Sequence, residues 1–246
     1  MGYHESLTEG RNAVLEAFRS GKTVDRLFVL DGCQDGPVKT ILREAKKQDT
    51  MVQYVKKDRL DQLSETKNHQ GVIAYCAACE YAEVSDILEN AKKKGEAPFI
   101  VLLDGIEDPH NLGAIIRTAN QAGAHGVIIP KRRAVGLTAT VARTSAGAVN
   151  YTPVAKVTNL VTVMEDLKKE GMWFVCADMD GEEMYSLNLK GPIGLVIGNE
   201  GEGVSRLVKE HCDMVASIPM KGDIDSLNAS VAMGVLAYEI VRQRRF

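Results

Sequence analysis

The order of apolar and polar positions divides the chain into two regions that each alternate strands and helices. Over the first 76 residues, short apolar runs alternate with amphipathic segments. Strands are predicted at 26–30, 50–55 and 71–76, and helices at 11–20, 38–48 and 58–65. This alternation is typical of a small α/β domain.

A charged stretch separates this region from the rest of the chain. Residues 80–97 contain three successive lysines, and Gly95 and Pro98 follow them. A hinge near 76–82 and a helix over 84–94 fit this composition. We therefore predict an N-terminal domain over 1–77, a linker with a first helix over 78–97, and a second domain over 98–246.

The second region has the pattern of a Rossmann-like parallel sheet. It begins with a continuous apolar run, Phe99 to Leu103, which is typical of a buried parallel strand. Asn111 and Ser226 are the predicted N-caps of the helix that follows this strand and of a long final helix. The remaining predicted elements are strands at 126–130, 154–157, 173–177, 194–198 and 214–219, helices at 138–148 and 159–170, a short helix before Met214, and an acidic turn at 178–181.

Two polar loops follow predicted strands near the end of the chain. The first is 198-GNEGEG-203, and the second covers 220–225 and leads into the final helix. Loops at the carboxyl ends of parallel strands commonly form small-molecule pockets. The glycine loop matches neither a dinucleotide fingerprint, whose third glycine position holds Arg206, nor a phosphate-binding Walker loop.

Composition and charge narrow the classes of function. The formal net charge is −3, so any surface that binds nucleic acid must be local. The candidate basic patches for RNA are Lys131 to Arg133 and the C-terminal Arg242, Arg244 and Arg245, although a charged helix end is more often a solvated terminus.

Cysteines and apolar runs give no sign of a metal site or a membrane segment. Cys76 and Cys79 form a C-x-x-C without a second pair or a histidine pair, which favours an ordinary strand end. The five cysteines are scattered, and no apolar run approaches 18 residues. We predict a cytoplasmic protein with no metal and no membrane partner.

Three motifs in the second region resemble a known family. The segment 104-DGIEDPHNLGAIIRTANQAGAHGVIIP-130 and the two loops of the tail from Gly194 resemble those of the SpoU/TrmH family, RNA ribose 2′-O-methyltransferases that use S-adenosylmethionine. In the first region, 10-GRNAVLEAF-18 and 69-HQGVIAY-75 resemble the RNA-binding front domain of the RlmB branch, which methylates a guanosine of 23S ribosomal RNA. The resemblance implies a SPOUT-type trefoil knot in the second domain and a homodimer formed through it. Hydrophobic periodicity predicts no knot.

The resemblance also implies roles for particular residues. Main-chain contacts with S-adenosylmethionine are expected from Gly198, Asn199, Ile218, Met220 and Leu227. The reaction site is expected to hold Asn111, Arg117, Glu200, Ser226 and Asn228, with Glu200 orienting Asn111.

Arg117 can take two roles in such a reaction. Methyl transfer to a ribose hydroxyl requires a positioned nucleophile and the removal of one proton. A guanidinium normally titrates above pH 12. Arg117 therefore either binds the RNA phosphate and stabilises the developing alkoxide, or an apolar site lowers its pKa enough for it to act as the base. A surface arginine or a buried ion pair is the alternative without chemistry.

Three other interpretations of the chain stay open at this point. The same chemistry on transfer RNA is the nearest, and a non-catalytic RNA-binding or ribosome-assembly factor comes from another class. A nicotinamide-dependent oxidoreductase is disfavoured by the missing third glycine. In the front domain, the polar loop 67–70 offers a candidate RNA contact, and its residues are equally typical of a turn.

Overall fold

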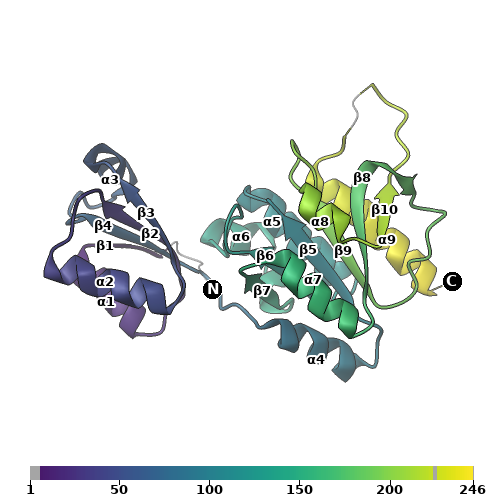
Figure 1. The fold of residues 1–246 in the computed structure, drawn as a ribbon, viewed down its shortest axis with the longest axis horizontal. Coiled ribbons are helices and arrows are strands. Elements are labelled where there is room, and N and C mark those ends of the chain that lie inside the picture. Colours follow the sequence, from purple (N-terminus) through teal and green to yellow (C-terminus); the bar gives the residue numbers. More distant parts are fainter. Residues whose placement is uncertain (1–5, 224–225, 246) are drawn as a thin grey trace. The chain divides into compact units, whose positions relative to one another are not determined.

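The computed structural model describes residues 6–223 and 226–245. Ile224 and Asp225, in the second predicted loop, lie outside this range. The chain divides into two compact units, of which the first ends at Glu80 and also includes Gly136–Ala139 (Figure 1).

The first unit is a four-stranded sheet with helices on both faces. The strands are β1 (Ser6–Glu9), β2 (Val24–Leu30), β3 (Met51–Val55) and β4 (Val72–Cys76), in the order β1-β4-β2-β3. Strand β4 is antiparallel to both neighbours, and β3 is parallel to β2. Helices α1 (Arg11–Arg19) and α2 (Gly36–Lys47) pack on one face, and α3 (Lys57–Leu63) packs on the other. Strand β1 was not predicted, because its stability comes from pairing with the distant β4.

The second unit contains the predicted parallel sheet. Its strands are β5 (Phe99–Asp104), β6 (Gly126–Pro130), β7 (Val154–Val157), β8 (Trp173–Glu183), β9 (Ile193–Gly198) and β10 (Met214–Ser217). Their order is β10-β8-β9-β5-β6-β7, and every neighbouring pair is parallel. Because all six strands end at the same side, the loops that follow them gather at one edge, which we call the carboxyl edge.

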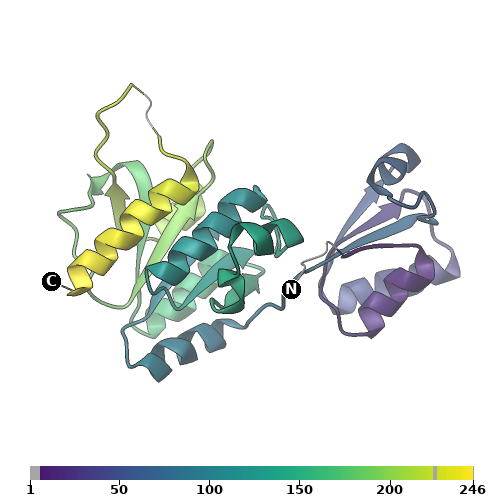
Figure 2. The ribbon, with the colours of Figure 1, turned by 180° about the vertical axis from the view of Figure 1, so that it is seen from behind.

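Helices cover both faces of this sheet (Figures 1 and 2). Helices α4 (Val84–Lys94), α7 (Leu160–Lys169) and α8 (Arg206–Glu210) bury one face around Ile100, Leu102 and Phe174. Helices α5 (Pro109–Gln121) and α9 (Ala229–Arg245) pack together on the other face. The predicted helix at 84–94 is confirmed to the residue.

Two helices begin elsewhere than predicted. The N-cap of α5 is Asp108, whose Oδ1 accepts from the His110 N–H at 3.0 Å, while Asn111 lies in the first turn. Helix α9 begins at Ala229, and the Oδ1 of Asn228 accepts from the Ser230 N–H at 2.9 Å. Each segment contains two residue types that favour the N-cap, so Asn111 and Ser226 were wrong choices between acceptable candidates. Proline at the first position of α5 also favours the earlier start.

The second unit departs from the predicted elements at three further places. The predicted acidic turn at 178–181 is part of β8, whose pairing with β10 shifts register between Val215 and Ala216. The predicted helix at 138–148 divides into α6 (Ala139–Thr144) and a 3-10 turn, Ala148–Asn150, because Ala146 and Gly147 adopt positive φ angles of 50° and 85°. The last strand ends at Ser217 instead of residue 219.

Candidate active site at the carboxyl edge

The glycine loop after β9 is a closed and well-fixed structure. The side chain of Asn199 donates to the Gly105 carbonyl at 2.9 Å and accepts from the Gly201 N–H at 2.8 Å. The main chains of Asn199 and Gly203 exchange two further hydrogen bonds, of 3.0 and 2.8 Å. At Gly198, an added Cβ would lie 2.0 Å from the Gly203 carbonyl carbon. The loop therefore requires glycine at position 198.

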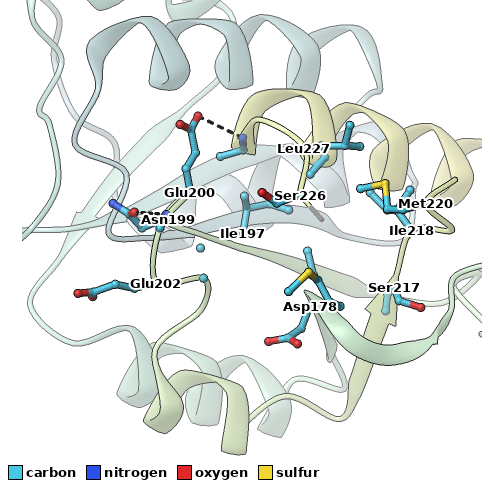
Figure 3. A pocket seen from close by; sticks show the side chains of 18 of the residues that line it. Asp178, Ile197, Asn199, Glu200, Glu202, Ser217, Ile218, Met220, Ser226 and Leu227 are labelled. Carbon is cyan, nitrogen blue, oxygen red and sulfur yellow. Dashed lines mark hydrogen bonds between the residues drawn. The ribbon is translucent and has the colours of Figure 1, made fainter. Parts of the chain in front are cut away.

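Glu200 joins two side chains that come from distant parts of the chain. Its Oε1 accepts from the Asn111 Nδ2 at 2.8 Å and also from the Asn228 Nδ2. The same Nδ2 of Asn228 donates to the Asn111 Oδ1 at 3.0 Å. The Ala229 N–H also approaches Glu200, at 3.4 Å, and Figure 3 marks this contact by the dashed line from Glu200 to the start of α9. Within the described residues, Oε2 of Glu200 has no hydrogen-bond partner. We call these three residues the amide–carboxylate cluster.

A cavity of about 700 Å³ lies beside this cluster, within the range typical of small-molecule sites. Figure 3 shows Glu200 and Leu227 on one side of it and Asp178 on the other. All five residues predicted to contact the cofactor line the cavity: Gly198, Asn199, Ile218, Met220 and Leu227.

The cavity wall suits S-adenosylmethionine in shape and polarity. Ile197, Ile218 and Leu227 supply apolar surface for an adenosyl group. The main-chain N–H and C=O groups of Ile218 and Leu227 have no hydrogen-bond partner within residues 6–223 and 226–245, so they are available to a ligand with polar edges. Carboxylates on the same wall suit a sulfonium cation. The residues present therefore fit this cofactor.

The acidic side of the cavity was not predicted as part of a site. Asp178, Glu183 and Glu202 line it, and Asp178 forms an ion pair with the Lys209 Nζ at 2.7 Å. Burial acts to raise the pKa of Asp178, but the hydrogen bonds from Lys209 and from the Asp180 N–H outweigh it, so this pKa lies below its ordinary value. The acidic sequence at 178–183 could have indicated this side of the cavity, but residues 178–181 were predicted to form a turn.

Two predicted site residues stand apart from the amide–carboxylate cluster. Ser226 lines the cavity with an exposed side chain. Arg117 lies on the exposed side of α5 and does not line the cavity. It forms no hydrogen bond or ion pair with any residue that the structure describes. The structure thus brings together Asn111, Glu200 and Asn228, and leaves Arg117 free to meet a ligand from solvent.

In the first unit, the buried residue of the candidate loop 67–70 is held in place by hydrogen bonds to neighbouring residues. His69 is buried, its Nε2 lies 3.0 Å from the Asp61 carboxylate, and its Nδ1 accepts from the Gly71 N–H at 3.0 Å. Lys67 and Asn68 are exposed. His69 is therefore a structural residue in this loop.

The structure adds three observations about cysteines, metals and membranes. The described residues include all five cysteines and no disulfide bond between them, and Cys76 belongs to the core of the first unit. The described residues hold no group of three or more histidine, cysteine or acidic side chains that could bind a metal ion. Across the described segments, no helix combines the length and the apolar character that a bilayer span requires.

Comparison with protein families covers both units. The SpoU rRNA Methylase family matches residues 98–238, which is more than half of the chain. The chain belongs to the SpoU family. A second family, described as RNA 2′-O ribose methyltransferase substrate binding, matches residues 7–82. The protein is thus an RNA 2′-O-ribose methyltransferase of the SpoU family with S-adenosylmethionine as its methyl donor.

Individual relatives agree with this family. YacO of Bacillus subtilis, named for the TrmH family of tRNA/rRNA methyltransferases, is 49% identical over 237 residues, which are 96% of this chain and 94% of YacO. The SpoU methyltransferase AviRb from Streptomyces viridochromogenes, in complex with AdoMet, is 27% identical with a TM-score of 0.62, covering 98% of this chain and 91% of AviRb. An AdoMet-bound rRNA methyltransferase from Sinorhizobium meliloti is 25% identical with a TM-score of 0.60, covering 96% of this chain and 86% of that one.

Proposed function

We propose that the protein methylates the 2′-OH of a guanosine in 23S ribosomal RNA. The observation that carries the site is the amide–carboxylate cluster beside the cofactor-sized cavity. The choice of ribosomal RNA is supported by the extent of structural similarity. The rRNA methyltransferase from S. meliloti covers 96% of this chain, whereas the TrmH/SpoU tRNA-modifying enzyme of A. aeolicus covers 65%, at 28% identity and a TM-score of 0.56. The similarity to the rRNA enzyme therefore extends over the front domain as well as the catalytic domain.

In this proposal each residue of the site binds or orients a reactant. S-adenosylmethionine, when bound, supplies an electrophilic methyl group. Main-chain groups of Ile218 and Leu227 hold its adenosyl part. Glu200 fixes the Asn111 and Asn228 amides, so that the ribose hydroxyl meets groups that are already oriented. Ser226 adds a hydroxyl at the cavity wall.

Arg117 receives the role of a clamp. Its side chain is exposed in the single chain. The single chain therefore does not provide the apolar surroundings that Arg117 would need to act as the general base. An exposed guanidinium suits a phosphate group, which it binds through two parallel hydrogen bonds. We assign Arg117 to the phosphate beside the target ribose and to the alkoxide charge that develops during transfer.

The homodimer and the trefoil knot are part of the same proposal and rest on the family. Val231 and Tyr238, seven positions apart on α9, are 49% and 51% exposed. Apolar side chains that are half exposed on one helix face support an interface between two copies there.

The substrate is tested by the transfer of labelled methyl from S-adenosylmethionine to unmodified 23S and transfer RNA transcripts. We expect label on the 23S transcript that is lost with Asn111→Ala, because Glu200 then loses one of its donors. Label only on transfer RNA would overturn the choice of RNA and keep the site. Label on 23S RNA that Asn111→Ala leaves unchanged would overturn the site.

A further inference from the structure

The carboxyl edge of the second unit has opposite charges at its two ends. The acidic side chains lie around the cavity, in β8 beyond Ala177 and in the loop after β9: Asp178, Glu183, Glu200 and Glu202. On the other side of β5, the loop after β6 carries Lys131, Arg132 and Arg133, and α6 carries Arg143. The amide–carboxylate cluster lies between these two ends, because Asn111 follows β5 and Glu200 follows β9.

Hydrogen bonds fix the basic loop next to the reaction site. The Val135 N–H donates to the Ile106 carbonyl at 2.9 Å and ties the loop after β6 to the loop after β5. The Thr144 Oγ1 on α6 donates to the Pro109 carbonyl at 3.3 Å, at the start of α5. Asn111 lies in the same first turn of α5. The basic side chains therefore lie on segments that directly contact the segment bearing Asn111.

The three arginines of this end are available to a ligand. Arg132 and Arg133 are exposed and have no ion pair within the described residues. Arg143 is also exposed, and its guanidinium donates to the Thr140 hydroxyl at 3.1 Å. The nearby acids are Asp108, which caps α5, and the exposed Glu107. Positive charge thus exceeds negative charge at this end.

The backbone of Arg133 decides which substitution suits this position. Its φ angle is 53°, in the left-handed region that side chains other than glycine rarely adopt. Asp49, Lys67, Gln70 and Ala146 share this conformation, so the angle marks a tight turn in the loop and shows that glycine is the substitution that fits position 133.

The C-terminal basic cluster has a different use. The Arg244 guanidinium donates to the carbonyls of Ala97, Pro98 and Gly191, at 3.0, 2.9 and 2.8 Å. These carbonyls lie before β5 and β9, at the opposite edge of the sheet from the site. Arg242 is paired with Glu239 on its own helix, with a nitrogen–oxygen distance of 2.7 Å. Arg242 and Arg244 are therefore engaged within the second unit, and Arg245 is the member of this cluster that is exposed without an ion pair in the described chain.

We propose that Arg132, Arg133 and Arg143 form the surface that binds the RNA backbone on one side of the target nucleotide. The proposal rests on the proposed function and specifies how the catalytic unit itself holds the substrate. A polyanion is attracted to the basic end and a cationic cofactor to the acidic end, so the two reactants meet at the cluster between them. Arginine suits this role because its guanidinium binds phosphate oxygens in pairs. Phosphate contacts position the strand without reading its sequence.

The test compares two double variants that remove equal charge. R132A/R133G removes two arginines of the basic end, and glycine suits the positive φ at position 133. The matched control is K92A/K190A, since both lysines are exposed, precede strands at the opposite edge, and have no ion pair in the described chain. Fluorescence anisotropy gives the affinity for an unmodified 23S transcript fragment and for a transfer RNA transcript at several KCl concentrations. Calorimetry gives the affinity for S-adenosylmethionine.

We expect R132A/R133G to weaken RNA binding about tenfold at low salt. The slope of log K against log[KCl] should also become shallower by about 0.7 for each phosphate that the protein no longer neutralises. The control variant should keep the wild-type slope, and both variants should keep the wild-type affinity for S-adenosylmethionine. R132K/R133K should restore most of the slope, because the slope depends on charge.

Equal slopes and equal RNA affinities for R132A/R133G and the control would overturn this inference while leaving methyl transfer intact. If the wild type methylates only transfer RNA, the proposed substrate fails, and the slopes measured on transfer RNA still decide the basic surface. If the wild type methylates neither RNA, the proposed function fails, and a shallower slope for R132A/R133G alone would still assign RNA binding to this end.

Discussion

The two units each gather polar loops where parallel strands end, but they use those polar groups differently. In the first unit, the Glu9 carboxylate accepts hydrogen bonds from Ser64 and from the Glu65 and Thr66 N–H groups, the latter at 2.8 and 3.2 Å. His69 is likewise held at both ring nitrogens. In the second unit, Glu200 offers one oxygen to two amides and leaves the other without a partner in the described chain.

This difference indicates that the polar network of the first unit stabilises the fold, whereas that of the second unit serves the reaction. Both networks join segments that are distant in the sequence, but a carboxylate that the protein itself satisfies at both oxygens fixes the shape of the loop it binds. A carboxylate that keeps a free acceptor beside a cavity is organised for a ligand. The variants below should therefore affect chemistry in the second unit and stability in the first.

The largest effect is expected from Arg117→Ala. Loss of the guanidinium removes both the clamp on the RNA phosphate and the charge that stabilises the developing alkoxide, so the rate of methyl transfer should fall about 100- to 1,000-fold. Calorimetry should find the affinity for S-adenosylmethionine unchanged, because Arg117 does not line the cavity. Lys92→Ala is the control for the loss of one exposed positive charge. A rate within threefold of wild type would remove Arg117 from the site.

Glu200→Ala should lower the rate about 100-fold, because Asn111, Asn228 and the start of α9 lose their common acceptor. Glu200→Gln keeps one acceptor oxygen and should lose less. Single-turnover transfer with saturating cofactor measures this series. Equal losses for the two variants would show that the carboxylate charge, and not the positioning of the two amides, is what matters.

Gly198→Ala should affect cofactor binding, because the new Cβ would lie 2.0 Å from the Gly203 main chain. Overpacking of this kind costs about 1–3 kcal/mol, which corresponds to roughly tenfold or more in the Kd for S-adenosylmethionine. Gly201→Ala is the matched control, since its nearest neighbour would be the Asn199 Oδ1 at 3.6 Å. Equal affinities of the two variants for S-adenosylmethionine would show that the glycine at position 198 is not needed for cofactor binding.

The smallest effect on catalysis is expected in the first unit, from Glu9→Ala. Burial acts to raise the pKa of Glu9, but hydrogen bonds from Ser64, Glu65 and Thr66 outweigh it and hold this pKa below its ordinary value. A lowered carboxyl pKa stabilises the folded state above the pKa of the unfolded chain, and that stability is lost as the pH falls below about 4. Thermal unfolding at neutral pH should show a loss of about 1–3 kcal/mol.

The pH series distinguishes this explanation from a general packing defect. The difference in stability between wild type and Glu9→Ala should shrink as the pH falls from 6 to 3, and the affinity for S-adenosylmethionine should stay at the wild-type value. A difference that is constant with pH would contradict the assigned cause.

Periodicity predicted most of the elements, because burial acts on residues close in sequence. The continuous run at Phe99 and the amphipathic segment at 84–94 are examples, and both were found where expected. Strand β1 and the extension of β8 beyond Ala177 depend on pairing with distant strands, which no local pattern contains. The N-cap of α5 was misplaced for another reason, since Asp108 and Asn111 satisfy the same local preference and the proline after Asp108 favours the earlier start.

The site was predictable only where motifs marked it. The glycine loop and the start of the final helix drew attention to Glu200 and Asn228, but spacing alone could not place Asn111 beside them. The acids at Asp178 and Glu183 escaped notice because their segment resembles a turn. The roles of the site residues, the knot and the dimer stay predictions from the family.

In the proposed function, the amide–carboxylate cluster directs a methyl group from S-adenosylmethionine to a ribose hydroxyl. The most direct test is to label an unmodified 23S transcript with the wild-type protein, digest it completely to nucleosides, and identify the labelled one by mass spectrometry. We expect 2′-O-methylguanosine, with the label lost in Glu200→Ala. A methyl group on a base, or a label that survives Glu200→Ala unchanged, would contradict the proposed function.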